Sequence, residues 1–361
     1  MESAKEGKPV TEIPIFMSLI KTLKAIAVNG SAAMYDGGEV GQSIINALGG
    51  AITKEDLANY TVQERAPLTT MIGQHEVMVS PSPSSGPELL ALLNSFAYLK
   101  TQLKSFGKVT ADYLHSLANI LENLEDLQLR LGDSQATQAQ ARQESMLDKN
   151  NAPHWASDIQ KESFNPSYSL SDPVASNVAV MDKKDNYVSV VTSLNTWFGS
   201  KVMTSSGILL NNAMANFAIP NDSGELETFN QLAEGRRPLT PNVVALSMDT
   251  QNICGTRIVT GGATASSVGQ VLAFPLLLNS DLRSSVDAAR IDVHNSSILL
   301  ENMDVRGSFK DRVVSDFKQI DDVTFMKIPF TTVNALEKTI DQPISIDDYR
   351  SGGHSEFQDF Y

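Results

Sequence analysis

The sequence has 361 residues and a mass of 39.1 kDa, enough for one large domain or two ordinary ones. Its net charge of −14 excludes a nucleic-acid-binding surface as the main feature, because a phosphate backbone would repel such a surface. The single cysteine, Cys254, excludes an intrachain disulfide and a thiolate metal cluster, and the five histidines show no metal-ligand spacing, so we expect no metal or cofactor.

The sequence predicts neither a membrane anchor nor a signal peptide in this chain. No apolar run approaches the ~18 residues that a membrane span needs. Residues 1–11 are charged where the apolar core of a signal peptide would lie. Asn-X-Ser/Thr sequons, which would be glycosylated only in a secreted protein, occur at Asn29, Asn59, Asn221 and Asn295.

Apolar residues recur at helical spacing through the first third of the chain. The helices predicted in this way are 16–27, 40–48, 88–99 and one long helix with a leucine stripe from Thr110 to about Leu131. Thr53 and Asp56 form a capping-box pattern that predicts a short helix ending at Leu57. Residues 76–79 have the pattern of a strand.

The composition changes near Gly132. Residues 133–165 are rich in Gln, Ala, Ser and Asn without sustained periodicity, which predicts a polar, mobile surface segment. After this segment the pattern has a period of two and predicts a hairpin of strands 177–181 and 187–194. Further predicted elements are strands at 208–210, 243–248, 257–260, 297–300 and 323–328 and helices at 266–278 and 280–291. This mixture favours stacked sheets with helical outer layers.

Generic motifs predict no activity. The chain contains no phosphate loop, no dinucleotide fingerprint and no G-x-S-x-G elbow. The pair Asp347-Asp348 is interpreted as a solvated acidic turn rather than a cation site.

Seven motifs, in order along the chain, resemble those of one known family. They are Tyr35–Val40, Gly49–Tyr60, Pro83–Gly86, Thr192–Ser200, Ser206–Asn212, Arg236–Leu239 and Asp348–Gly353. Together they resemble the gamma-glutamyltransferases, or glutathione hydrolases, and the departures from the family pattern are similar to those of the glutathione hydrolase 7 branch.

The resemblance implies an α+β fold of the N-terminal-nucleophile type, a four-layer αββα sandwich. It begins well inside the family's large subunit, so we expect the sandwich to be incomplete. The resemblance divides the chain into 1–174, similar to the C-terminal part of the large subunit, and 175–361, similar to the small subunit.

Family chemistry depends on a threonine that cleaves the peptide bond before itself and then attacks the γ-glutamyl amide, with its freed amine as base. Counted back without gaps from Ser193–Asn195, that position holds Ala175, whose methyl group cannot attack a carbonyl. Ser176 is the alternative nucleophile. A shift of one residue along a strand turns a side chain to the opposite face, unless the turn at 183–186 slips by one residue.

The resemblance also implies changes in substrate binding. It places Ser193 beside the nucleophile and Asn195 facing the substrate. The residues that hold the α-amino group correspond to Ala213 and Asn216, which removes a carboxylate and a hydrogen-bond acceptor.

Two further pairs of family positions differ. The serine pair that binds the α-carboxylate corresponds to Thr240 and Pro241, and proline has neither an N–H nor a hydroxyl to donate. The glycine pair of the oxyanion hole corresponds to Thr264 and Ala265. Backbone donors survive this change, but glycine conformations do not.

These changes predict a family member that neither processes itself nor hydrolyses glutathione, and that binds γ-glutamyl compounds weakly. Such a pseudoenzyme would act as a binding or regulatory module, with a protein partner that the sequence does not name. The alternative is a divergent glutathione hydrolase of glutathione catabolism that uses Ser176. A third hypothesis is a fragment without a role of its own. The resemblance implies membrane-anchored, extracellular-facing relatives, whose anchor would lie in the part of the family pattern that this chain does not contain.

Overall fold

The computed structural model describes residues 14–104, 106–107, 110–133, 137–157, 174–218, 229–252, 254–294, 297–301, 322–326, 331–340 and 342–350. The chain divides into two compact units. The smaller comprises residues 1–64 and 194–213, and the larger comprises 65–193 and 214–361. The boundary at 174/175 stays a prediction, because it concerns correspondence to family subunits and not packing.

The smaller unit is helical, as predicted. Its helices are α2 (Pro14–Asn29), α3 (Ala32–Tyr35), α4 (Glu39–Ala47) and α5 (Lys54–Ala58). The capping box that begins α5 is confirmed: the Asp56 N–H donates to the Thr53 hydroxyl (3.1 Å), and the Thr53 N–H donates to the Asp56 carboxylate (2.8 Å). This exchange satisfies two of the N–H groups that every helix start leaves unpaired.

Hydroxyl groups connect the segment 194–213 to these helices by hydrogen bonds. Thr22 Oγ1 donates to the Ser206 carbonyl (2.8 Å), and the hydroxyls of Ser43 and Ser206 lie 2.5 Å apart. The prediction of a strand at 208–210 is wrong, since the segment forms only a single bridge between Met203 and Leu209. Beside this bridge, the Leu210 N–H donates to the Val202 carbonyl (3.0 Å) and the Thr204 N–H donates to the Ile208 carbonyl (2.9 Å).

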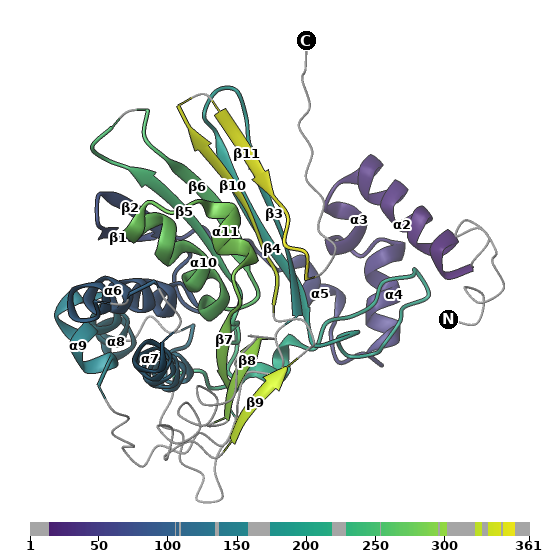
Figure 1. The fold of residues 1–361 in the computed structure, drawn as a ribbon. Helices are drawn as coiled ribbons and strands as arrows, with labels where there is room; N and C mark the ends of the chain where they lie inside the picture. Colours follow the sequence, from purple (N-terminus) through teal and green to yellow (C-terminus); the bar gives the residue numbers. More distant parts are fainter. Residues whose placement is uncertain are drawn as a thin grey trace, which may run out of the picture. The chain divides into compact units, whose positions relative to one another are not determined.

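The larger unit is built on a six-stranded antiparallel sheet of order β1-β2-β5-β6-β10-β11. The strands are β1 (Leu68–Ile72), β2 (His75–Val79), β5 (Val243–Asp249), β6 (Arg257–Gly262), β10 (Val333–Thr339) and β11 (Gln342–Ile346). Figure 1 shows α10 (Ala265–Leu278) and α11 (Leu282–Asp287) on one side of this sheet. The same side packs on α6 (Gly86–Gln102), whose other neighbours include α7 (Ala111–Leu129).

The predicted hairpin covers the other face of the sheet. It consists of β3 (Val174–Met181) and β4 (Tyr187–Asn195), and β3 packs on β6 and β10. The packing is close at Gly261 of β6, where an added Cβ would come within 2.9 Å of the Val191 side chain. A helical layer, a sheet and a second sheet therefore stack in sequence, which is the expected αββα sandwich in incomplete form.

A smaller sheet adjoins α7. It contains β7 (Ile291–His294) antiparallel to β8 (Ser297–Glu301), which pairs in parallel with β9 (Asp322–Met326). The predicted helix 280–291 is therefore too long. It ends at Asp287, and Ala288 has extended backbone angles (φ −60°, ψ 142°) that lead into β7.

The prediction of a mobile segment over 133–165 is wrong for residues 137–155. These residues form α8 (Thr137–Leu147), the 3-10 turn Lys149–Asn151 and α9 (Ala152–Trp155). Met146 and Trp155 are buried and pack into the main core. The apolar side of this segment is narrow, so helix formation depends on packing against α6 rather than on a strong periodic pattern. Residues 134–136 and 158–165 lie outside the described residues.

Three carboxylates gather where α6, α7 and β7 meet. Burial raises the pKa of Glu88 well above its usual range, and the neighbouring Glu125 and Asp292 raise it further. Burial raises the pKa of Glu125 to about 8, with a further contribution from the negative charge of Asp292. Charged carboxylates are disfavoured in these surroundings, so Glu88 and Glu125 stay protonated at pH values at which an exposed glutamate would be ionised.

We predict that this cluster makes the fold less stable as the pH rises. In the unfolded chain, Glu125 is ionised at any pH above its ordinary pKa of 4.5. In the folded chain it keeps its proton up to about pH 8. The folded state therefore binds more protons, and the free energy of unfolding falls between about pH 4.5 and 8, by at most about 1.4 kcal/mol per pH unit for this group.

Urea unfolding at half-unit pH steps across that interval should show a shallower decline for Glu125→Gln than for the wild type. Glu144→Gln, which neutralises an exposed carboxylate of α8, is the matched control and should retain the wild-type slope. Identical slopes for wild type and Glu125→Gln would contradict the interpretation.

Candidate functional site

The hairpin places Ala175 on its inward side and Ser176 on its outward side. Asn177 is buried, its side-chain amide donates to the Asn334 carbonyl of β10 (3.0 Å), and its Oδ1 accepts from the Asn334 N–H (3.2 Å). Ala175, two residues earlier, therefore faces the same way and is half-buried. Ser176 is exposed, on the face that carries Val178 and Val180.

Ser193 lies opposite the beginning of β3. Its hydroxyl donates to the carbonyl of Val174, the residue before Ala175. Ser189, on the same side of β4, donates to the Thr260 carbonyl of β6 (2.8 Å). The inward face of the hairpin thus offers hydroxyl groups that hold backbone carbonyls, whereas the residue at 175 offers only a methyl group.

The turn Pro83–Ser85 and the loop 240–242 are joined by four hydrogen bonds. The Thr240 N–H donates to the Pro83 carbonyl (2.9 Å), and the Ser85 hydroxyl donates to the Thr240 carbonyl (2.9 Å). The carbonyl of Asn242 accepts from the Ser84 hydroxyl (2.7 Å) and the Ser85 N–H (3.3 Å). These contacts fix Thr240 and Pro241 beside a turn that the sequence motifs also single out.

Asn216 lies next to this loop. Only 2% of its surface is exposed, and its side-chain amide donates to the carbonyl of Leu239, the residue before Thr240. Asn230 completes the connection, because its amide donates to the Asn216 carbonyl (2.6 Å) and its Oδ1 accepts from the Leu239 N–H (3.0 Å). The structure therefore brings together the predicted positions Asn216, Thr240 and Pro241.

Thr264 and Ala265 form the junction of β6 and α10. Thr264 caps the helix: its Oγ1 accepts from the Ser267 N–H (3.2 Å) and lies 3.3 Å from the Thr331 hydroxyl. Its φ of −139° is an ordinary extended value that a threonine adopts without strain. Thr264 therefore needs no glycine-like conformation, and Ala265 beside it is fully packed, with 1% exposed.

Asn195 and Ala213 belong to the smaller unit. Asn195 ends β4 with a φ of +79°, which asparagine tolerates better than most residues, and its amide donates to the Asn212 carbonyl (3.3 Å). Ala213 begins the 3-10 turn Ala213–Asn216, and its N–H donates to the Asn211 side chain (3.0 Å). Of the sequons, Asn29 and Asn59 are exposed, and Asn221 and Asn295 lie outside the described residues.

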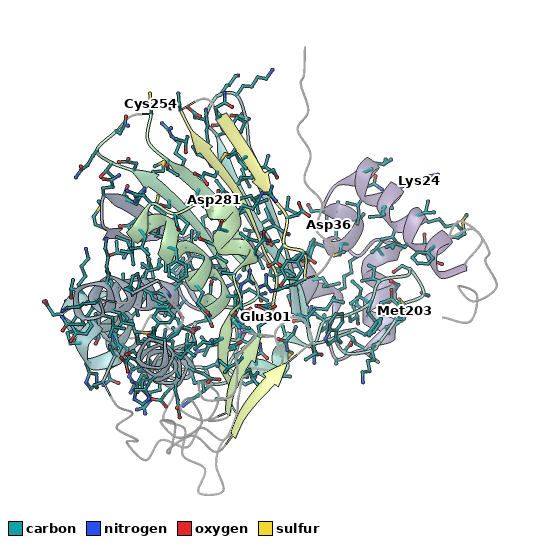
Figure 2. The ribbon with its side chains drawn as sticks, viewed as in Figure 1. Lys24, Asp36, Met203, Cys254, Asp281 and Glu301 are labelled. Atoms are coloured by element: carbon teal, nitrogen blue, oxygen red, sulfur yellow. The ribbon has the colours of Figure 1, made fainter. Side chains whose placement is uncertain are left out.

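Sequence reasoning missed a buried network of two arginines and two carboxylates in the larger unit. Arg290 donates to Asp348 (2.7 Å) and to the Thr331 carbonyl (2.6 Å). Arg350 donates to both oxygens of Glu301 (2.6 and 2.7 Å) and to Asp348 (2.8 Å). Figure 2 places Glu301 at the end of β8, among the side chains of the interior.

The interpretation of Asp347-Asp348 as a solvated turn is wrong for Asp348, which is completely buried. Burial alone would raise the pKa of Asp348, but Arg290, the Val333 N–H and Arg350 together lower it below its usual value. Sequence spacing could not reveal this role, since Arg290 and Asp348 are 58 positions apart. The only signal was the family-like run Asp348–Gly353.

Among the described residues, no group of three His, Cys, Asp or Glu side chains is arranged to hold a metal ion. None of the described helices has the length and apolar character to span a bilayer. Cys254 lies exposed at the tip of the β5–β6 connection, as Figure 2 shows.

We predict that Asp348→Asn lowers the free energy of unfolding by about 3–5 kcal/mol, because it leaves the buried cations Arg290 and Arg350 undercompensated. Chemical unfolding at pH 7 measures the loss. Asp347→Asn, which changes the neighbouring half-buried carboxylate, is the matched control and should cost less than about 1 kcal/mol. Equal effects of the two substitutions would show that the network does not have this role.

Comparisons with known proteins show what the chain is similar to. The family model described as gamma-glutamyltranspeptidase matches residues 5–357. Glutathione hydrolase 7 of Mus musculus is 32% identical over 306 residues, which cover 78% of this chain and 45% of that protein. Glutathione hydrolase 2 of Arabidopsis thaliana is 30% identical over 300 residues, covering 76% of this chain and 50% of that protein.

A solved structure shows the same fold. Cephalosporin acylase from Bacillus halodurans matches with a TM-score of 0.75 at 18% identity, over 95% of this chain and 63% of that one. The chain therefore spans about half the length of the curated relatives it matches and about two thirds of this structural neighbour.

Proposed function

The chain belongs to the gamma-glutamyltranspeptidase family, and we propose that it is a noncatalytic member that neither processes itself nor hydrolyses glutathione. The relatives named glutathione hydrolases suggest γ-glutamyl compounds as the ancestral substrates. The proposal that this chain differs from these relatives in activity rests on the side chain at position 175 of β3 and on the residues around it.

The observation that carries the proposal is the methyl group of Ala175 on the inward side of the hairpin. Its strand is aligned by Asn177 with β10, and Ser193 donates to the carbonyl immediately before it. A threonine in this place would have its hydroxyl close to the bond that family members cleave. Alanine provides no oxygen for the attack and no proton for a base to remove.

The alternative nucleophile is less well placed. Ser176 is exposed on the outward face, opposite in direction to Asn177. The turn at residues 183–186 is held by Asp182, whose carboxylate accepts from the N–H groups of Lys184 (2.8 Å) and Asn186 (2.9 Å). These bonds oppose the one-residue slip that would turn Ser176 inward.

The residues at the positions expected to bind the α-amino and α-carboxylate groups of a γ-glutamyl substrate support weak binding. Asn216 uses its side-chain amide to hold the Leu239 carbonyl, and an amide cannot neutralise an α-ammonium group as a carboxylate does. Pro241 has no N–H or hydroxyl for the α-carboxylate. We infer that the fold persists as a binding or regulatory module, with a protein partner as one class of ligand.

We predict that the purified protein runs as a single species of intact mass and releases no product from glutathione or a γ-glutamyl anilide above background. The missing hydroxyl prevents the first acyl shift, so no free N-terminal nucleophile forms. Mass spectrometry and a colorimetric assay measure the two outcomes, and calorimetry should detect no micromolar binding of glutathione.

Two fragments with a new N-terminus at Ser176 would contradict the proposal. If Ser176→Ala then abolished both the cleavage and any turnover, the divergent-hydrolase alternative would replace it.

We also predict that Ala175→Thr fails to restore γ-glutamyl turnover, although partial self-cleavage can return because it needs no substrate pocket. Catalytic groups act as a unit, so repair of one member of a changed set recovers little. Ala213, Asn216 and Pro241 would still hold the substrate poorly.

The matched control is Ala179→Thr, which adds the same hydroxyl to the same face of β3, four residues further along. It should neither cleave nor turn over substrate. Robust turnover by Ala175→Thr alone would mean that the substrate pocket is intact and that the noncatalytic proposal is wrong.

A further inference from the structure

A cavity of about 280 Å³ lies in the larger unit, apart from the positions discussed above. Its polar lining comes from Arg65, Ser82, Gln140 and Gln143, and its apolar lining includes Leu68 and Leu131. Ligand pockets typically combine apolar walls with a few placed polar groups, and this volume is near the lower end of their range. It suits a ligand of about the size of a single amino acid derivative.

Arg65 is the cationic group of this cavity. It donates to the Ser82 carbonyl (2.6 Å) and to the carboxylate of Asp133. These bonds use two of the five N–H groups of a guanidinium, and its side chain remains 24% exposed. The arginine is therefore held in a fixed orientation and retains donors for a planar anion.

The same surroundings limit the charge of the ligand. The Asp133 carboxylate lies against the guanidinium and partly offsets its charge. A dianionic phosphate would be repelled by the Asp133 carboxylate, and the lining supplies only one cation, Arg65, to balance its two charges. A monocarboxylate needs only two parallel N–H donors, which one arginine can supply. The geometry favours a carboxylate.

Two glutamines provide the remaining polar groups. Gln143 accepts from the Ser82 N–H through Oε1 (3.3 Å), which leaves its NH₂ group as a donor. Gln140 is an exposed residue of α8 that lines the same cavity. Side-chain amides of this kind pair with an amide group, and the leucines accept an aliphatic group.

We propose that this cavity is a binding site for a monocarboxylate that also carries an amide and an aliphatic group, that is, an N-acyl amino acid. The carboxylate pairs with Arg65, the amide contacts Gln140 and Gln143, and the aliphatic part packs on Leu68 and Leu131. The site does not depend on Ala175 or on glutathione hydrolysis.

The test is isothermal titration of the full chain with N-acetyl-L-leucine. A ligand of this size should bind with a dissociation constant of about 1 mM or below. N-acetyl-L-leucinamide, which has the same shape without the charge, and inorganic phosphate should each bind at least tenfold more weakly. Equal binding of the acid and its amide would overturn the proposal, as would the absence of saturable binding.

Two variants locate the site. Arg65→Gln should weaken binding at least tenfold, and because it also removes a partner of Asp133, its fold is checked by circular dichroism. Gln140→Ala changes an exposed side chain and should weaken binding about three- to tenfold through the loss of one hydrogen bond. Gln138→Ala, an exposed glutamine of the same helix that does not line the cavity, is the matched control and should bind like the wild type. Wild-type affinity in Gln140→Ala would place the ligand elsewhere and refute the site.

Discussion

The buried network of Arg290, Glu301, Asp348 and Arg350 is the constraint on which the larger unit depends. Its four charges cancel, and each ion has a partner at hydrogen-bond distance, which is the condition under which buried charges are tolerated. Arg350 also donates to the carbonyls of Val286 and Ala288 at the end of α11. One set of side chains thus ties together the end of a helix, the strand β8 and the chain after β11.

The network reaches the candidate site through one asparagine. Asp348 accepts from the Val333 N–H of β10 (2.9 Å), and the Asp348 N–H donates to the Asn334 side chain (3.0 Å). The backbone of Asn334 exchanges two hydrogen bonds with the side chain of Asn177, two residues after Ala175. The strand that carries Ala175 is therefore aligned by the same groups that hold the C-terminal part of the sheet. None of these bonds involves the side chain of Ala175, so the alignment of the strand does not depend on the chemistry of that position.

The sequence predicted the strong elements of the fold and missed those that depend on context. The leucine stripe of α7, the capping box at Thr53 and the hairpin of β3 and β4 follow local patterns, and the structure contains them. The strands β1, β10 and β11 of the main sheet and β7 of the smaller sheet were not predicted, and β1 and β11 are the two edges of the main sheet, with five residues each. The site could be predicted only by resemblance, since its positions come from separate loops. Its supporting ion network could not be predicted, because nothing in local spacing pairs Arg290 with Asp348.

The turn Pro81–Ser85 lies between the proposed cavity site and the loop of Thr240 and Asn242. On one side, Ser82 lines the cavity and is bound by three groups: its carbonyl by Arg65, its N–H by Gln143 and its hydroxyl by the Gly132 carbonyl. On the other side, Pro83, Ser84 and Ser85 hold the loop of Thr240 and Asn242. A ligand that binds Arg65 or Gln143 would compete with the bonds that these side chains make to Ser82, and the next three residues are bonded to the loop. Because the turn is bonded on both sides, we expect a ligand in the proposed cavity site to change the geometry at Thr240 and Pro241.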